Sequence, residues 1–294
     1  MARPFRFGVN MLTPAGGTDW RTRCRRAEQL GYDVILVPDH LGLPAPSPAL
    51  VAAAEATERP RVGTFVLNAA FWNPTLLARE AAGTDALTEG RLELGIGAGY
   101  VREEHDRAGI EFLSPGGRVD HLRRTVEELD RLLRDDNHVP KSPQHPRPPL
   151  LIGGNGNRVL RLAARFAEIV AFTGAVSDRT GKLVPLTAEQ LDERVAAYRR
   201  FAAAARESPA ELNLLIQFVR TTNDRRAAVR EVLPLTPHLD EDQALALPLL
   251  AMGTVRAVTE QLRERRERYG FSYLTVLEPN MEAFGPIVQE LAGS

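Results

Sequence analysis

The 294-residue sequence has few of the features that assign a protein to a special class. Its single cysteine, Cys24, excludes an internal disulfide framework and is typical of a reducing compartment. No stretch approaches the roughly 18 consecutive apolar residues of a membrane span. The N-terminal MARPFRFGVN also lacks the apolar core of a secretory signal. We therefore expect a soluble, cytoplasmic protein.

The sequence also lacks a marked excess of either charge. Its formal net charge is −1, so we expect no general attraction to nucleic acid or to an anionic membrane. The metal-site patterns HExxH and CxxC and the nucleophile pattern GxSxG are absent. Glu103, Glu104, His105 and Asp106 are consecutive and cannot all converge on one ion, so we expect no metal.

What the sequence does contain is a regular alternation of β-rich runs and helical patterns. The β-rich runs predict eight strands, at residues 5–10, 33–37, 61–67, 91–96, 150–152, 169–172, 212–219 and 273–277. Helical spacing and capping residues predict helices at about 19–30, 48–58, 74–88, 118–134, 157–165, 187–206, 225–233, 241–251, 254–270 and 281–291. Residues 175–185 are expected to form a long polar loop.

Strands that alternate with helices form parallel sheets. Eight such units, with no low-complexity linker between them, fit an α/β fold with one closed (β/α)8 TIM barrel better than two doubly wound domains. We therefore expect a single domain over residues 1–294, with extra loop and helix insertions. A barrel of this kind carries its site at the C-terminal strand ends, where polar residues and glycines concentrate in this sequence.

The run GGNGNR after the fifth predicted strand is the first candidate site. Gly153, Gly154 and Gly156 let the backbone approach a ligand closely. The next helix, which Asn157 is expected to cap, offers free N–H groups and the positive end of its dipole. The sequence therefore predicts a phosphate site there, and the alternative is a tight turn without a ligand.

Two further strand ends carry candidate residues. His40, beside Asp39, is the candidate for proton transfer because histidine titrates near neutral pH. The run GAGYVREE after the fourth strand lets a flat ring lie against the backbone, where Tyr100 can stack on it and Glu104 can accept a hydrogen bond. The alternatives are a structural histidine and a turn with solvated carboxylates.

Three of these runs together resemble a known family. LTEGRLELGIGAGYVREEHDRAGIEF (87–112), AEQLGYDVILVPDHL (27–41) and LLIGGNGNR (150–158) are similar to segments of the bacterial luciferase-like oxidoreductases, particularly the deazaflavin-dependent branch that uses coenzyme F420. Related sequences commonly carry tryptophan where Tyr100 stands, and Arg-His where Trp72 and Asn73 stand.

The resemblance implies a barrel that is usually a homodimer and holds F420 or FMN at its mouth. It places His40 and Asp39 near the ring, and Asn68 and Ala69 on a third-strand segment that often supports the ring through a cis peptide. Residues expected to border the cofactor or hold its phosphate are Gly97, Gly99, Tyr100, Gly153, Gly154, Asn155, Gly156, Asn157, Thr173 and Gly174.

From this resemblance we expect a coenzyme F420-dependent oxidoreductase that moves a hydride between the deazaflavin and a small organic substrate. His40 is the expected proton donor or acceptor. Two alternatives remain open: an FMN-dependent monooxygenase on the same scaffold, and a barrel that binds cofactor without catalysis. The choice of F420 follows the resemblance, in which Asp39 and His40 favour the deazaflavin branch.

Overall fold

The computed structural model of the protein describes residues 3–12, 17–177, 183–237 and 239–294. Its main sheet contains the parallel strands β1 (Arg6–Asn10), β2 (Val34–Val37), β3 (Arg61–Thr64), β4 (Leu67–Asn68), β5 (Leu92–Gly97), β6 (Leu150–Gly153), β7 (Ile169–Phe172), β10 (Glu211–Ile216) and β13 (Phe271–Leu277). β1 pairs with β13 from Arg6–Tyr273 to Asn10–Leu277, and β3 pairs with β5. These pairings close the sheet.

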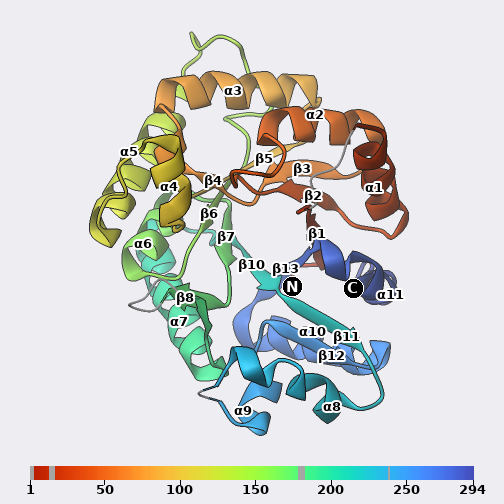
Figure 1. The fold of residues 1–294 in the computed structure, drawn as a ribbon. Coiled ribbons are helices and arrows are strands. Elements are labelled where there is room, and N and C mark those ends of the chain that lie inside the picture. Colours follow the sequence, from red (N-terminus) through yellow and green to blue (C-terminus); the bar gives the residue numbers. More distant parts are fainter. Residues whose placement is uncertain (1–2, 13–16, 178–182, 238) are drawn as a thin grey trace.

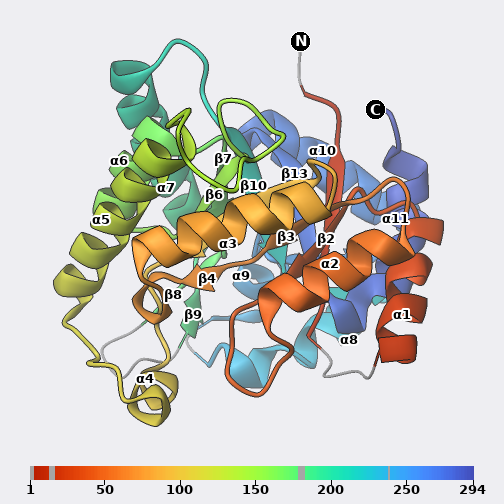
Figure 2. The same ribbon diagram turned by 90° about the horizontal axis from the view of Figure 1, so that it is seen from above.

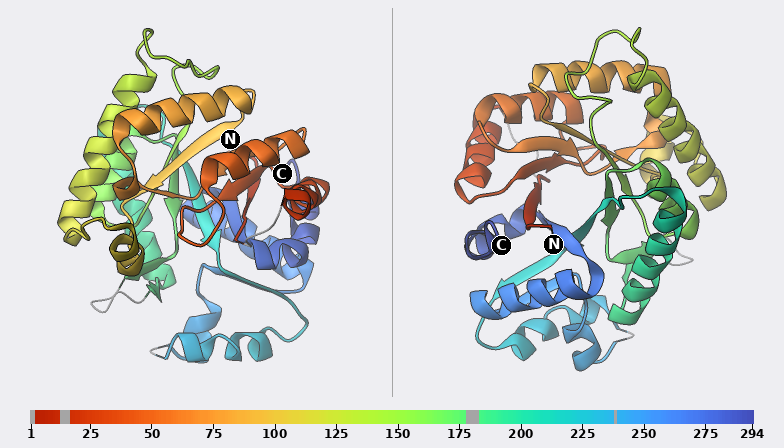
Figure 3. Two further views of the ribbon diagram at one scale, coloured as in Figure 1. Left: turned by 45° about the horizontal axis from the view of Figure 1, so that its top comes forward. Right: turned by 180° about the vertical axis from the view of Figure 1, so that it is seen from behind.

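The closed sheet is an eight-part barrel, because β3 and β4 are two pieces of one strand position. Both pair with β5, and the short break between them contains a cis peptide bond from Phe65 to Val66. Figure 3 shows the closed ring of strands with helices around it. The expected (β/α)8 barrel is confirmed.

Helices cover the outside of the barrel (Figure 1). They are α1 (Gly17–Gln29), α2 (Pro46–Ala56), α3 (Pro74–Leu87), α4 (Arg102–Ala108), α5 (Pro115–Leu133), α6 (Asn157–Phe166), α7 (Ala188–Ala205), α8 (Arg225–Arg230), α9 (Glu241–Leu245), α10 (Val255–Tyr269) and α11 (Met281–Leu291), with short 3-10 turns at Ala69–Phe71, Leu233–Leu235 and Glu278–Asn280. Asn73 caps α3, Thr254 caps α10, and Thr187 with Gln190 forms the predicted capping box of α7. None of the helices in the described part of the chain combines the length and apolar character that a membrane span requires.

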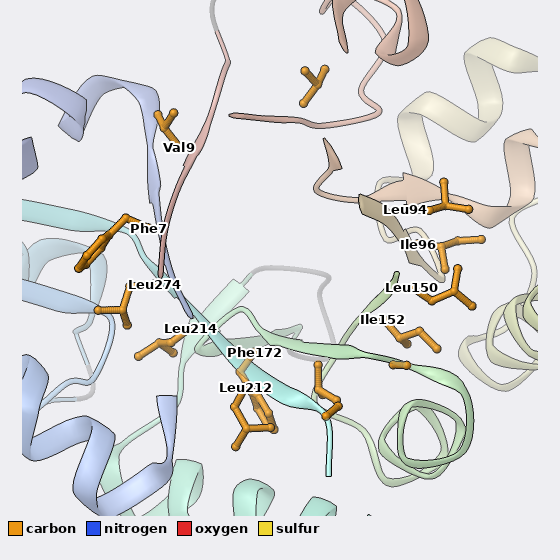
Figure 4. Packing of buried hydrophobic residues seen from close by; sticks show 14 of the residues in the cluster. Phe7, Val9, Leu94, Ile96, Leu150, Ile152, Phe172, Leu212, Leu214 and Leu274 are labelled. Carbon is orange, nitrogen blue, oxygen red and sulfur yellow. The ribbon is translucent and has the colours of Figure 1, made fainter. Parts of the chain in front are cut away.

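Alternation along the strands divides the core into two layers, because neighbouring side chains of a strand point to opposite faces. In β6, Leu150 and Ile152 belong to the layer between barrel and helices, whereas Leu151 belongs to the cluster inside the barrel. Figure 4 shows the outer layer, where Leu94 and Ile96 of β5 lie beside Leu150 and Ile152. Both faces of the barrel strands are therefore largely buried, as the continuous apolar runs predict.

The strand ends that carry the candidate residues face away from the chain termini. In Figure 2 the N- and C-termini lie at one side of the barrel, and α4 lies at the opposite side with the paired strands β8 (Ala175–Ser177) and β9 (Leu183–Pro185). Insertions therefore gather around the C-terminal end of the barrel, which is called the mouth below.

Four local predictions were wrong or incomplete. Residues 175–185 do not form a plain loop, because β8 and β9 pair as antiparallel strands; residues 178–182 lie outside the described part. The helix predicted at 241–251 ends at Leu245, and β12 (Leu250–Gly253) follows it. The strand predicted at 212–219 is divided between β10 and β11 (Phe218–Thr221), and β11 pairs with β12 outside the barrel. The helix α4 was not predicted.

Candidate functional site

A histidine and a glutamate form a close pair at the mouth. His40 follows β2, and its Nδ1 lies 2.9 Å from Oε1 of Glu104. The side chains of His40 and Glu104 are 33% and 13% exposed, so solvent reaches the imidazole more than the carboxylate. Tyr100 packs against the imidazole in an edge-to-face arrangement, with 5.9 Å between the ring centroids. The structure thus brings together His40 and Tyr100, which were sequence candidates, and adds Glu104 as a direct partner.

The short helix α4 positions this glutamate. Glu103 and Glu104 lie in its first turn, where acidic side chains are favoured, and Gly109 ends it with φ 67°. Glu104 is a possible hydrogen-bond acceptor in the sequence run GAGYVREE, but it was not among the predicted site residues. The sequence feature that could have revealed α4, and with it the position of Glu104, is the helix-forming run REEHDRA between Val101 and Gly109.

Asp39 is held by two donors rather than by a cation. Its Oδ2 accepts hydrogen bonds from the backbone N–H of Asn68 at 3.2 Å and from Nε1 of Trp72 at 3.1 Å. Burial raises the pKa of the Asp39 carboxyl above its usual range, and these two hydrogen bonds only partly oppose that rise. Asp39 therefore ties the end of β2 to the end of β4.

Asn68 continues this network into the protein interior. Its Oδ1 accepts from the N–H of Ala70 at 3.1 Å, which leaves its amide Nδ2 to donate to Nε2 of the fully buried His105 at 3.1 Å. The carbonyl of Ala69 contacts Nε2 of His121 at 3.1 Å. The consecutive residues Glu104 and His105 thus contact two different strand ends, so they do not converge on one point.

Glycines of the strand ends make room for the protein's own side chains. A Cβ atom on Gly97 would lie 2.8 Å from Val66, whereas a Cβ on Gly153 would make an ordinary van der Waals contact with the same side chain, at 3.4 Å. A Cβ on Gly99, whose φ is 70°, would lie 2.3 Å from Oδ1 of Asn68. Close approach of a ligand is therefore not needed to explain glycine at positions 97 and 99.

The start of α6 differs from these crowded turns. Gly156 is the N-cap residue and has no side chain to bond the free N–H groups of the first turn, so the prediction that Asn157 caps this helix was wrong. Asn157 is the first helical residue, and its Oδ1 accepts from Arg194 of α7 at 3.1 Å. A Cβ atom on Gly156 would meet no atom within 4 Å, so the space before this helix is open. The arrangement offers backbone donors and a helix dipole to an anion.

The neighbouring strand ends fix the shape of this turn. Nδ2 of the buried Asn155 donates to Oγ1 of Thr173 at 3.1 Å and to the carbonyl of Ala175 at 2.6 Å. Gly154 and Gly174 adopt φ values of 145° and 68°, which side-chain-bearing residues rarely adopt. Asn155, Thr173 and Gly174 thus support the turn from β6 to α6.

One sequence candidate near this turn is already neutralised. Arg158 was considered as extra charge for a phosphate, but its guanidinium pairs with Asp120 of α5 and donates to the carbonyl of Gly116 at 3.2 Å. Arg194, which was not a candidate from the sequence, is the arginine in hydrogen-bond contact with the first residue of α6, and it also forms an ion pair with the neighbouring Glu193 at 3.6 Å.

The residues at the mouth fit a flavin-like cofactor and give no support for a metal. The open, uncapped start of α6 fits a phosphate group, and the His40–Glu104 pair provides a group for proton transfer at the same end of the barrel. Among the residues that the structure describes, no group of three or more His, Cys, Asp or Glu side chains is arranged to hold a metal ion.

Comparison with known proteins identifies relatives of two kinds. A flavin-dependent trigonelline monooxygenase, oxygenase component, from Acinetobacter baylyi is 32% identical over 149 residues, which cover 44% of this chain and 41% of that protein. An F420-dependent glucose-6-phosphate dehydrogenase from Beutenbergia cavernae is 30% identical over 218 residues, which cover 65% of this chain and 60% of that protein. The matched segments thus span less than two thirds of these curated relatives.

Comparison with solved structures shows that the protein shares its fold with known enzymes. A solved F420-dependent secondary alcohol dehydrogenase, in complex with an F420-acetone adduct, superposes with a TM-score of 0.75 at 17% identity and covers 97% of both chains. The family model described as luciferase-like monooxygenase matches residues 2–275. The protein therefore belongs to the luciferase-like monooxygenase family, as its resemblance to luciferase-like oxidoreductases indicates.

Proposed function

We propose that the protein is a coenzyme F420-dependent oxidoreductase that acts on a small organic substrate. The observation that carries the proposal is the His40–Glu104 pair at the mouth, with Tyr100 packed against the imidazole. Oxidation of an alcohol removes a hydride from carbon and a proton from oxygen, and reduction of a carbonyl adds both. A deazaflavin supplies the hydride chemistry when bound, so the protein needs one group that exchanges a proton.

His40 is suited to that exchange. Glu104 contacts Nδ1, which leaves Nε2 to take a proton from a substrate hydroxyl or to return it to a carbonyl oxygen. The Glu104 carboxylate orients the ring and stabilises the imidazolium that forms when His40 takes the proton. Tyr100 packs edge-to-face against the imidazole of His40 and so restricts the movement of that imidazole.

The start of α6 is the proposed phosphate site of the cofactor. The N–H groups after Gly156 are not used by a side-chain cap, and the guanidinium of Arg194, which is also paired with Glu193, lies beside Asn157. Asn68, Ala69, Gly97, Gly99 and Tyr100 lie at the strand ends between this site and His40 in the order of the barrel, and are the proposed surroundings of the ring.

The FMN-dependent monooxygenase alternative has a specific observation in its favour, namely the flavin-dependent monooxygenase among the relatives. The two functions differ in their need for oxygen. A deazaflavin reacts poorly with oxygen, whereas a flavin monooxygenase consumes it.

The experiment is an anaerobic activity screen with purified protein. Reduced F420 is offered with carbonyl, imine and activated alkene acceptors, and oxidised F420 with alcohols. We expect turnover without oxygen and its loss in His40→Ala. Turnover that needs reduced FMN and oxygen would support the monooxygenase. No turnover with either cofactor would support a barrel that binds a cofactor without catalysis.

A further inference from the structure

An open cavity of about 730 Å³ lies on the outside of the barrel, between α9, α10 and the beginning of α7. Of the described residues that line it, none belongs to the candidate site at the mouth. Its volume is in the range of pockets that bind small organic molecules. Three arginines contribute to its wall: Arg225 at the start of α8, and Arg265 and Arg268 in α10 (elements labelled in Figure 1).

Among the described residues, Arg225 and Arg265 have no carboxylate within ion-pair distance. Arg265 is 9% exposed and Arg225 is half-buried, and among the described residues neither forms an ion pair. Nη2 of Arg265 donates to the carbonyl of Leu250 at 2.7 Å, and Nη2 of Arg225 donates to the carbonyl of Leu245 at 2.6 Å. Nη1 of Arg265 and Nε of Arg225 have no acceptor within the described part of the chain.

The absence of a counter-ion is costly, because a buried charge without a partner loses favourable hydration that nothing replaces. Burial, and then repulsion from Arg225, lowers the pKa of Arg265 to about 10. Burial also lowers the pKa of Arg225. Glu264, exposed at the cavity, attracts both arginines but forms an ion pair with neither. A bound anion would supply the missing negative charge.

The other groups around the cavity restrict the kind of anion. Carboxylates line it as well, namely Glu189, Asp242, Glu264 and Glu267. Of the charged groups at the cavity, Asp242 is already paired with Arg226, and Arg268 is already paired with Asp192. These carboxylates repel a ligand with two or more negative charges. Leu245, Ala246, Pro248 and Tyr269 add apolar surface. The planar guanidinium group matches a carboxylate in shape and hydrogen-bonding pattern.

We propose that this cavity binds a small monocarboxylate with an apolar body, whose carboxylate lies against Arg225 and Arg265. The proposal does not depend on the proposed function, because the cavity and the mouth share none of the described residues named here.

Isothermal titration of the whole protein tests the proposal with matched probes. The monocarboxylates are phenylacetate, benzoate and 4-methylpentanoate, each compared with its neutral amide and with inorganic phosphate. We expect at least one monocarboxylate to bind, with its amide and phosphate at least tenfold weaker. Binding of no monocarboxylate, equal binding of an amide, or tighter binding of phosphate would overturn the proposal.

Three variants locate the binding and keep the test independent of folding defects. Arg225→Gln changes the half-buried arginine and should weaken binding at least tenfold. Glu264→Gln removes a competing negative charge and should tighten it. The control Arg256→Gln, also in α10 but 89% exposed, should leave affinity unchanged. Wild-type affinity in both Arg225→Gln and Glu264→Gln would contradict the assignment of the site to this cavity.

Discussion

At the scale of single residues, the mouth depends on pairs that join distant parts of the chain. His40 and Glu104 are 64 positions apart, and Asn68 and His105 are 37 apart. The sequence analysis could select His40, because histidine after a buried strand is a recognisable pattern. It could not identify its partner, because that pairing depends on where the unpredicted helix α4 lies.

The first prediction concerns the proton-transfer pair. His40→Asn should lower kcat by about 10²–10⁴-fold, the usual contribution of a general acid or base. Glu104→Gln should lower kcat less, because an amide still orients the ring but does not stabilise its charged form. Steady-state kinetics with F420 and the best substrate from the screen measure both effects. Cofactor affinity should change little, and an unchanged kcat in His40→Asn would remove the histidine from the mechanism.

A second prediction follows from the pKa of Asp39, which burial raises in the folded protein. A raised folded-state pKa means that this carboxyl favours folding at low pH and that the contribution is lost as the pH rises through that pKa. Asp39→Asn keeps an acceptor for Trp72 and Asn68 without the charge. The variant should therefore melt at a higher temperature than the wild type at neutral pH.

Melting temperatures of the wild type and of Asp39→Asn, measured over a series of pH values, provide the control for this prediction. The difference in melting temperature should vanish as the pH falls toward about 3.9, the ordinary pKa of aspartate. Asp106→Asn, on the exposed side of α4, should show no such trend. A variant at position 39 that melts below the wild type at neutral pH would show that the charge itself stabilises the fold.

At the scale of helices and strands, prediction from sequence succeeded where both faces of an element are buried. The strands β2, β6 and β7 appear as short apolar runs because the barrel interior and the helix layer each cover one face. The same logic failed for α4, whose only buried residue is His105, so it has no apolar stripe to detect. It also failed for β12, where Leu-Ala-Met favours a helix but pairing with β11 decides the conformation.

The third prediction tests the start of α6. Gly156→Asp places a carboxylate in the open space at the N-cap, where aspartate favours the helix but repels a phosphate. Thermal stability should be equal or slightly higher, while the affinity for F420 falls at least tenfold in a binding titration. Gly156→Asn, which caps the helix without a charge, is the matched control and should bind more tightly than Gly156→Asp. Equal affinity in the two variants would place the phosphate elsewhere.

At the scale of the whole molecule, the assembly state remains a prediction. Leu76 and Leu87 are 52% and 69% exposed on α3, and their separation of eleven residues places them on the same side of the helix. Burial of these two leucines against a second copy is consistent with the homodimer that the family resemblance implies. Light scattering should give twice the mass of one chain.

Variants can test which surface forms such a dimer. The double variant Leu76→Glu/Leu87→Glu should give monomers, whereas Leu235→Glu, which changes a comparably exposed leucine outside α3, should not. A wild-type protein that is monomeric at all concentrations would contradict the predicted homodimer.

The central claim is that the barrel mouth selects a deazaflavin. The most direct measurement is a parallel equilibrium titration of the cofactor-free protein with F420 and with FMN in the same buffer. The account predicts saturable binding of F420 that is at least tenfold tighter than binding of FMN. Tight binding of FMN without binding of F420 would contradict it.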